Sequence, residues 1–216
     1  MECKKCNSRW EPGQNASKAP DSLTPGQRNV SFGKYIWRVL DVQNGRALLL
    51  TEEILEERCY NSKWARVTWE TCDLRKYLNG TFLQSFSGQE QERIAKTEIR
   101  NADNPWYGTS GGRDTVDQVF LLSIDEVVKY FGDSGDLRAR KGWYYENGED
   151  VPYYINDEYN SARIVKYRGE EGWWWLRSPG YDGGYAAGVV DDGGLGVLGD
   201  NVFLVYGVRP ALWLNL

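Results

Sequence analysis

Residues 181–206, YDGGYAAGVVDDGGLGVLGDNVFLVY, constrain the fold more than any other part of the chain. The segment is rich in glycine and contains four aspartates, a composition typical of tight turns between short strands. Two apolar stretches flank it, WWWLR at 173–177 and GVRPALWLNL at 207–216. Both predict strands, the second with Pro210 at an edge or bulge. We therefore expect the carboxy-terminal part to be a sheet joined by tight hairpins.

The same segment lacks residue types that solvent-facing strand positions normally carry. Lys, Glu, Gln, Met and Trp make up 44 of the 216 residues, so roughly five would be expected among these 26 positions. None is present. None of these five types can be reached from an Asn codon, AAC or AAT, by changing its two adenines alone. Every residue from 181 to 206 can be reached, as if an Asn-rich template had been mutated at adenines.

Length and composition favour one domain of an ordinary globular protein. The chain has 216 residues, 26% charged and 41% apolar, without an apolar run near the roughly 18 residues that span a bilayer. The start MECKKCNSRW has no apolar core of a secretory signal, so we expect a cytoplasmic protein without membrane insertion. A net charge of −5 and the lack of a clustered Lys/Arg field predict no nucleic-acid partner.

Four cysteines and no histidine exclude several chemistries. A Ser-His-Asp or Cys-His arrangement is impossible, as is any His-containing metal site. Cys3 and Cys6 form CKKC, half a zinc knuckle, and a zinc ion could be held there together with Cys59 and Cys72 or across a dimer. The alternative is a degenerate remnant plus two reduced core cysteines.

The order of predicted elements is that of an α+β protein. Residues 7–28, rich in Pro, Gly, Ser and Asn, predict a tail, so residues 1–28 are taken as a flexible tail and 29–216 as the domain. A strand over 35–42, apolar on both faces, a turn at Asn44–Gly45 and a returning strand from 46 follow. Three helices are predicted, capped by Thr71, by Ser87 with Glu90, and by Ser123 with Glu126. A buried strand is predicted at 119–123, and residues 157–167 could be helical.

The frame WWWLRSPG at 173–180, a spaced AA, V and G skeleton, and GVRPALWLNL resemble the variable region of proteins diversified by bacterial and phage retroelements. The stretches FGKYIWRVLDV (32–42), ALLLTEEILEER (47–58), TWETCDLRKYLNG (68–80), NPWYGTSGG (104–112) and DQVFLLSIDEVVKYF (117–131) are similar to one gut-bacterial subgroup of them. The resemblance covers about residues 29–216.

The resemblance implies a C-type-lectin fold with a mixed, mostly antiparallel sheet, whose first and last strands pair. Two or more short helices pack on it, and a loop-rich face carries the hypervariable segment 181–206. It further implies that Ala186, Ala187, Val189, Gly193, Gly199, Val202 and Gly207 are scaffold. The displayed positions would be Tyr181, Asp182, Gly183, Gly184, Tyr185, Gly188, Val190, Asp191, Asp192, Leu198, Asp200, Asn201, Phe203, Leu204, Val205 and Tyr206.

The function implied is binding of a variant-specific ligand, expected to be a protein, without catalysis. Nearly all the net charge lies in 181–206, since the rest of the chain has 26 basic and 27 acidic residues. We therefore expect a basic ligand surface, or a neutral one with hydrogen-bond donors, contacted by Tyr181, Tyr185, Phe203 and Tyr206. Self-association would add avidity.

Three alternative functions stay open. One is an enzyme related to the formylglycine-generating oxidases, although these need a Cys pair or His-rich site in the carboxy-terminal half, where this chain has neither. Another is a calcium-dependent lectin, whose sugar-binding triplets are absent. The last is a structural module of a phage particle or multiprotein assembly.

Overall fold

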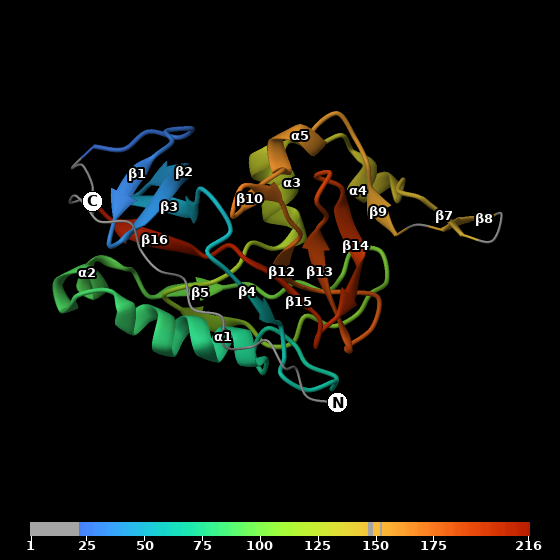
Figure 1. The fold of residues 1–216 in the computed structure, drawn as a ribbon, viewed down its shortest axis with the longest axis horizontal. Helices are drawn as coiled ribbons and strands as arrows, with labels where there is room; N and C mark the ends of the chain where they lie inside the picture. Colours follow the sequence, from blue (N-terminus) through green and yellow to red (C-terminus); the bar gives the residue numbers. More distant parts are fainter. Residues whose placement is uncertain (1–21, 147–148, 152) are drawn as a thin grey trace.

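The computed structural model describes residues 22–146, 149–151 and 153–216. Its strands form two main sheets, with short helices around them (Figure 1). The predicted α+β class is therefore confirmed. None of the helices in these ranges is long and apolar enough to cross a membrane.

The first sheet contains four antiparallel strands, β1 (Val30–Phe32), β2 (Tyr35–Gln43), β3 (Arg46–Thr51) and β16 (Ala211–Asn215), in that order. The turn between β2 and β3 lies where predicted, with both Asn44 and Gly45 at positive φ. The last strand pairs with β3, the returning strand of the hairpin, and not with the first strand. The expectation for β2 was wrong in one respect, because Ile36 is 43% exposed while its neighbours Tyr35 and Trp37 are buried.

A helical segment runs below this sheet in the view of Figure 1. It consists of α1 (Asp73–Tyr77), a π-helical turn η1 (Leu78–Phe82), a 3-10 turn η2 (Leu83–Ser85) and α2 (Gly88–Arg93). The capping box of Ser87 and Glu90 is present, whereas α1 is capped by the sulfur of Cys72 and not by Thr71. The cap prediction for Thr71 was wrong by one residue, since the Thr71 hydroxyl instead closes the preceding turn with Thr68.

The third predicted helix is α3 (Ile124–Phe131), with the expected capping box of Ser123 and Glu126. Two shorter helices follow, α4 (Asp136–Ala139) and α5 (Asn160–Arg163), so helix in 157–167 is limited to a single turn. The buried strand predicted at 119–123 is absent. These residues are buried, but only Phe120 forms a bridge, to Ala211.

The second sheet has six strands in the order β4-β15-β12-β13-β14-β9. Their bounds are β4 Glu56–Cys59, β15 Val205–Val208, β12 Trp174–Pro179, β13 Tyr185–Val189, β14 Leu195–Asn201 and β9 Tyr154–Ile155. Only the β12–β15 pair is parallel. Pro210 was expected at an edge or bulge of a single strand. It lies instead between β15 and β16, which belong to different sheets. Residues 181–206 thus supply β13, β14 and the start of β15, half of the strand residues of the second sheet.

Three two-stranded ribbons complete the fold: β5 (Thr97–Ile99) with β6 (Thr115–Asp117), β7 (Tyr144–Glu146) with β8 (Glu149–Val151), and β10 (Lys166–Tyr167) with β11 (Glu170–Glu171). In Figure 1 the β7–β8 ribbon extends away from the rest of the molecule.

The amino-terminal boundary differs from the one predicted. Leu23 is buried in the core, and the backbone of Gly26 and Gln27 hydrogen-bonds to Val39 of β2. Residues 22–28 are therefore packed against the domain because one apolar side chain and two backbone hydrogen bonds hold them there. Cys3 and Cys6, the proposed zinc ligands, lie outside the described residues.

The two cysteines of the domain differ in state. Cys59 is disulfide-bonded, and Cys72 is free and buried. The interpretation of both as reduced core cysteines was therefore wrong for Cys59. A disulfide sulfur is not a thiolate ligand, so Cys59 in this state has no thiolate to offer a zinc ion.

Candidate functional site

A pocket lies on one face of the six-stranded sheet, and the sheet register explains its shape. Four residues pair in a row across neighbouring strands: Trp175 with Gly188, Gly188 with Gly196, and Gly196 with Tyr154. The two central glycines carry no side chain, while aromatic rings stand at either end of the row. The result is a cavity of about 310 Å³ with a glycine floor and aromatic walls.

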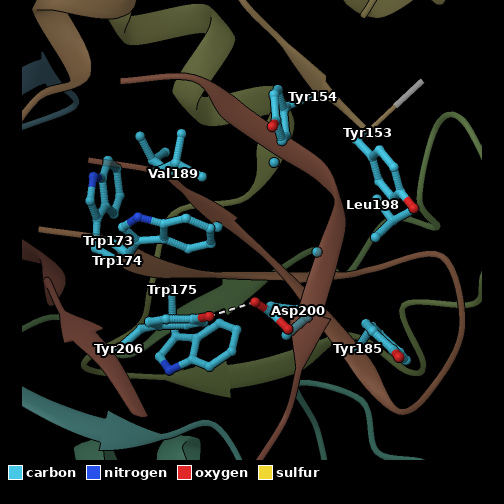
Figure 2. Close-up of a pocket in the computed structure, with 15 residues that line it drawn as sticks. Tyr153, Tyr154, Trp173, Trp174, Trp175, Tyr185, Val189, Leu198, Asp200 and Tyr206 are labelled. Carbon is cyan, nitrogen blue, oxygen red and sulfur yellow. Dashed lines mark hydrogen bonds between the residues drawn. The ribbon is translucent and has the colours of Figure 1, made fainter. Parts of the chain in front are cut away.

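The walls are built mainly from three rings. Trp173 stacks on Tyr206 with 5.0 Å between ring centroids, and Trp175 packs on Tyr206 at 4.8 Å. Figure 2 shows these rings on one side of the pocket and Tyr153 and Tyr154 on the other. Trp175 is fully buried and its indole N–H donates to the carbonyl of Arg58, which fixes the ring. Trp173, in contrast, is 37% exposed at the mouth.

One carboxylate faces this aromatic surface. Asp200 accepts a hydrogen bond from the hydroxyl of Tyr206, shown as the dashed line in Figure 2, and a second from the backbone N–H of Asn201. Burial raises the pKa of Tyr206 well above its usual value, and the adjacent carboxylate raises it further. Tyr206 therefore stays protonated and can act only as a donor to Asp200 at neutral pH.

Most of the predicted display positions are accessible. The exposed ones are Tyr181, Asp191 and Asp192; the partly exposed ones are Asp182, Gly183, Tyr185, Gly188, Leu198, Asp200, Asn201, Phe203, Leu204, Val205 and Tyr206. Six of the predicted positions line the pocket: Tyr185, Gly188, Val190, Leu198, Asp200 and Tyr206. Phe203, expected to contact ligand with the tyrosines, is not among the lining residues.

Two of the predicted display positions, Gly184 and Val190, are buried. Gly184 lies in the turn between β12 and β13, where its amide donates to Asp182 and its carbonyl accepts from Val202. Val190 is only 8% exposed and lies at the start of a turn closed by backbone hydrogen bonds with Gly193 and Gly194, where it lines the pocket. Such turn and strand-end positions are covered by their own neighbours.

The predicted scaffold positions are all held tightly. Ala186, Ala187, Val189 and Val202 are at most 1% exposed. At the three scaffold glycines, 193, 199 and 207, an added Cβ would lie 2.0, 2.4 and 2.5 Å from its nearest neighbouring atom. At the three display glycines, 183, 184 and 188, the corresponding distances are 3.2, 3.3 and 3.0 Å. An added Cβ is therefore impossible at the scaffold glycines without a backbone shift, whereas at the display glycines its neighbours would have to give by only a few tenths of an ångström.

Fixed side chains outside the segment hold its backbone in place. The buried amide of Asn104 donates to the carbonyls of Pro179 and Val197, both at 2.8 Å. The hydroxyl of Thr109 donates to the carbonyl of Tyr181 at 2.6 Å. These contacts reach only backbone carbonyls, those of Val197 and Tyr181 in the segment and of Pro179 just before it, so they do not depend on which side chains the segment carries.

Sequence reasoning missed several members of the site. Trp173 and Trp175 were assigned only to a strand, and Tyr153 and Tyr154 were not assigned at all. Trp64, 59% exposed, lies beside the turn at Gly184. The alternation of Trp173 and Trp175 on one strand face was a signal that could have indicated the pocket wall.

Within the described residues, no group of three or more His, Cys, Asp or Glu side chains is arranged to hold a metal ion. Burial raises the pKa of the Cys72 thiol to about 12, so it is not a reactive thiolate. The site is thus defined by aromatic surface, one carboxylate and a glycine floor.

Fold and site together define a sheet-rich α+β domain with an aromatic pocket on its carboxy-terminal sheet. The chain belongs to the family described as domain of unknown function DUF6273, whose model matches residues 44–216. No curated protein and no solved structure matches the chain. The matched residues include all six strands of the second sheet and all the pocket residues.

Proposed function

We propose that this chain is a ligand-binding display protein whose segment 181–206 is diversified by adenine-specific retroelement mutagenesis. The observation that carries the proposal is the separation of the segment into two classes of position. Residues assigned to the scaffold are buried or are glycines without room for a Cβ, whereas fourteen of the sixteen display positions are accessible. Diversity at the second class would change the surface without disturbing the core.

Backbone anchoring supports the same function. Val67 donates to the carbonyl of Gly183 at 2.8 Å, and Asn61 donates to that of Val202 at 2.8 Å. With the contacts of Asn104 and Thr109, these bonds fix the path of the segment without using its side chains. A rigid frame with interchangeable side chains is what binding surfaces require, because preorganisation lowers the entropic cost of association.

We further infer that the domain is a variant of the C-type-lectin fold. In support, the first three described strands and the last one form a single antiparallel sheet through the β3–β16 pair, and helices pack beside it. The loop-rich carboxy-terminal face, built from β12 to β15, carries the display positions.

Binding is favoured over catalysis. The fold-related oxidases need a Cys pair or a His-rich site, and this chain has no His. Its one free described cysteine, Cys72, is fully buried with a raised pKa, so it cannot attack a substrate. The expected partner is a protein, because tyrosine side chains among glycines on a fixed frame are typical of protein-binding surfaces.

The gene itself tests the proposal. Codons at the sixteen display positions should end in C or T, and a near-copy repeat with Asn codons and a reverse-transcriptase gene should lie nearby. Copies of the gene from several isolates should differ mainly at display positions and remain constant at Ala186, Ala187, Val189, Gly193, Gly199, Val202 and Gly207. Differences spread evenly over the domain, or codons ending in A or G at the display positions, would contradict it.

A further inference from the structure

We propose that the pocket on the six-stranded sheet receives a lysine or arginine side chain of a protein partner, with Asp200 as the charge that selects it. The identity of the partner as a protein rests on the proposed function. The preference of the pocket for a cation on an apolar stem rests on the geometry alone.

The aromatic walls suit such a side chain. Trp173, Trp175 and Tyr206 form a continuous wall, and Trp173 remains 37% exposed at the mouth. The faces of such rings attract a cation electrostatically. The hydrocarbon stem of lysine or arginine packs along apolar surface while its charged end reaches a polar partner. A cavity of about 310 Å³ over the glycine floor has room for one such side chain.

The charge of the pocket is negative and is not compensated within the described structure. Asp200 is the one carboxylate among the described lining residues, and those residues include no lysine or arginine. Its two hydrogen-bond donors, the Tyr206 hydroxyl and the Asn201 amide, are both neutral. Asp182, by contrast, already pairs with the guanidinium of Arg66 at 3.2 Å. Asp200 is therefore the carboxylate of the segment that faces an aromatic cavity with its charge available.

The pocket combines constant and variable parts. Trp173, Trp175 and Tyr154 lie outside residues 181–206, whereas Asp200 lies at a display position. The parts of the walls made by Trp173, Trp175 and Tyr154 would thus stay the same among variants, whereas Tyr206 is itself a display position, and position 200 would set the charge preference. In this chain Asp at 200 selects a cation; Asn or Ser there would select a neutral side chain.

Small probes test this without a known partner. N-acetyl-lysine methylamide and N-acetyl-arginine methylamide should quench or shift tryptophan fluorescence with saturable, millimolar affinity that weakens with added salt. The neutral N-acetyl-norleucine methylamide should bind less tightly. Asp200→Asn should weaken binding of the cationic probes by about fivefold or more and leave the norleucine probe within about twofold.

Two matched controls accompany these variants. Asp191→Asn removes an exposed carboxylate of the same segment outside the pocket and should change nothing. Trp173→Ala should weaken all three probes, whereas Trp143→Ala, which removes a 62% exposed indole that is not part of the pocket, should not. Circular dichroism confirms that each variant is folded.

Equal binding of the neutral and cationic probes, or an Asp200→Asn variant with unchanged affinity for lysine and arginine probes, would overturn the inference. So would tighter binding of a neutral sugar such as glucose. Because these measurements do not involve the gene, a failure here leaves the codon survey unaffected, and a failed codon survey leaves the probe result standing.

Discussion

Replacing Gly199 by alanine tests whether the segment 181–206 has a backbone frame that tolerates no side chain at defined positions. Gly199 lies in β14 at a φ of +77°, opposite an irregularity in the pairing of β13 and β14. An alanine Cβ there would lie 2.4 Å from the carbonyl oxygen of Ala186, a distance that forces the backbone to move.

The cost has two parts. A non-glycine residue in the left-handed region costs about 1–2 kcal/mol, and displacing a packed backbone costs about 1–3 kcal/mol more. We therefore expect Gly199→Ala to lower the free energy of unfolding by about 2–5 kcal/mol. For a chain of this size that corresponds to a fall in Tm of roughly 4–20 °C.

The matched control is Gly183→Ala in the same segment. Gly183 has no positive φ, and its added Cβ would lie 3.2 Å from the Cβ of Arg66. The change should alter stability by no more than about 0.5 kcal/mol. Urea titration and thermal melting followed by circular dichroism measure both variants. A Gly199→Ala protein as stable as Gly183→Ala would refute the division into frame and display positions.

Three further outcomes follow from the contacts of the site and core. Asn104→Ala removes both donors to the carbonyls of Pro179 and Val197 and should cost about 2–4 kcal/mol in urea titration, whereas loss of less than about 0.5 kcal/mol would mean that Asn104 does not hold the segment. The double variant Tyr181→Ser, Tyr185→Ser removes a ring contact of 4.4 Å on the surface and should lower Tm by only a few degrees; a collapse of the fold would show these rings to be core. The Ser62 hydroxyl lowers the pKa of Asp73, as do the Ser62 amide and Lys76, so the carboxylate stabilises the fold above its ordinary pKa of about 4 and this stabilisation is lost as the pH falls through the lowered value. Asp73→Asn should therefore cost up to about 1 kcal/mol at pH 7, because the side chain is 43% exposed, and nothing at pH 2; an equal deficit at both pH values would contradict the charge effect.

Local signals in the sequence predicted the parts of the fold that local interactions determine. The capping boxes at Ser87 and Ser123 and the turn at Asn44–Gly45 lie where expected, because each depends on residues at most three positions apart. The predicted cap of α1 was wrong by one residue, because the sulfur of Cys72 accepts the capping hydrogen bond that a hydroxyl oxygen usually accepts.

Long-range pairing could not be read in the same way. The stretch 119–123 has the apolar composition of a buried strand. No neighbouring segment in the described part of the chain pairs along its length, however, and Phe120 alone forms a β-bridge. Pro210 looked like a defect within one strand, but it marks the point where the chain leaves one sheet for the other. Both outcomes depend on which segments lie alongside, and hydrophobic pattern does not specify that.

The pocket was missed for the same reason. Its floor exists because Gly188 and Gly196 pair with each other, and its walls exist because Trp175 and Tyr154 are their next neighbours. The register between these strands includes shifts at both β12–β13 and β13–β14. A shift of one residue would have moved every side chain to the other face of the sheet, so composition alone could not place these residues together.

The turns of the segment show how an Asn-rich template would suit this fold. Asp182, Asp192 and Asn201 each accept a hydrogen bond from the backbone N–H two residues further on, at 2.7, 2.8 and 3.3 Å. Asn and Asp close such turns because their short side chains reach that amide. An Asn codon left unchanged, or changed at its first adenine to give Asp, keeps this ability, and a different change at the same adenine gives Tyr. On the proposed origin, an unchanged codon and these two changes at the first adenine would therefore either preserve a turn or add an aromatic contact.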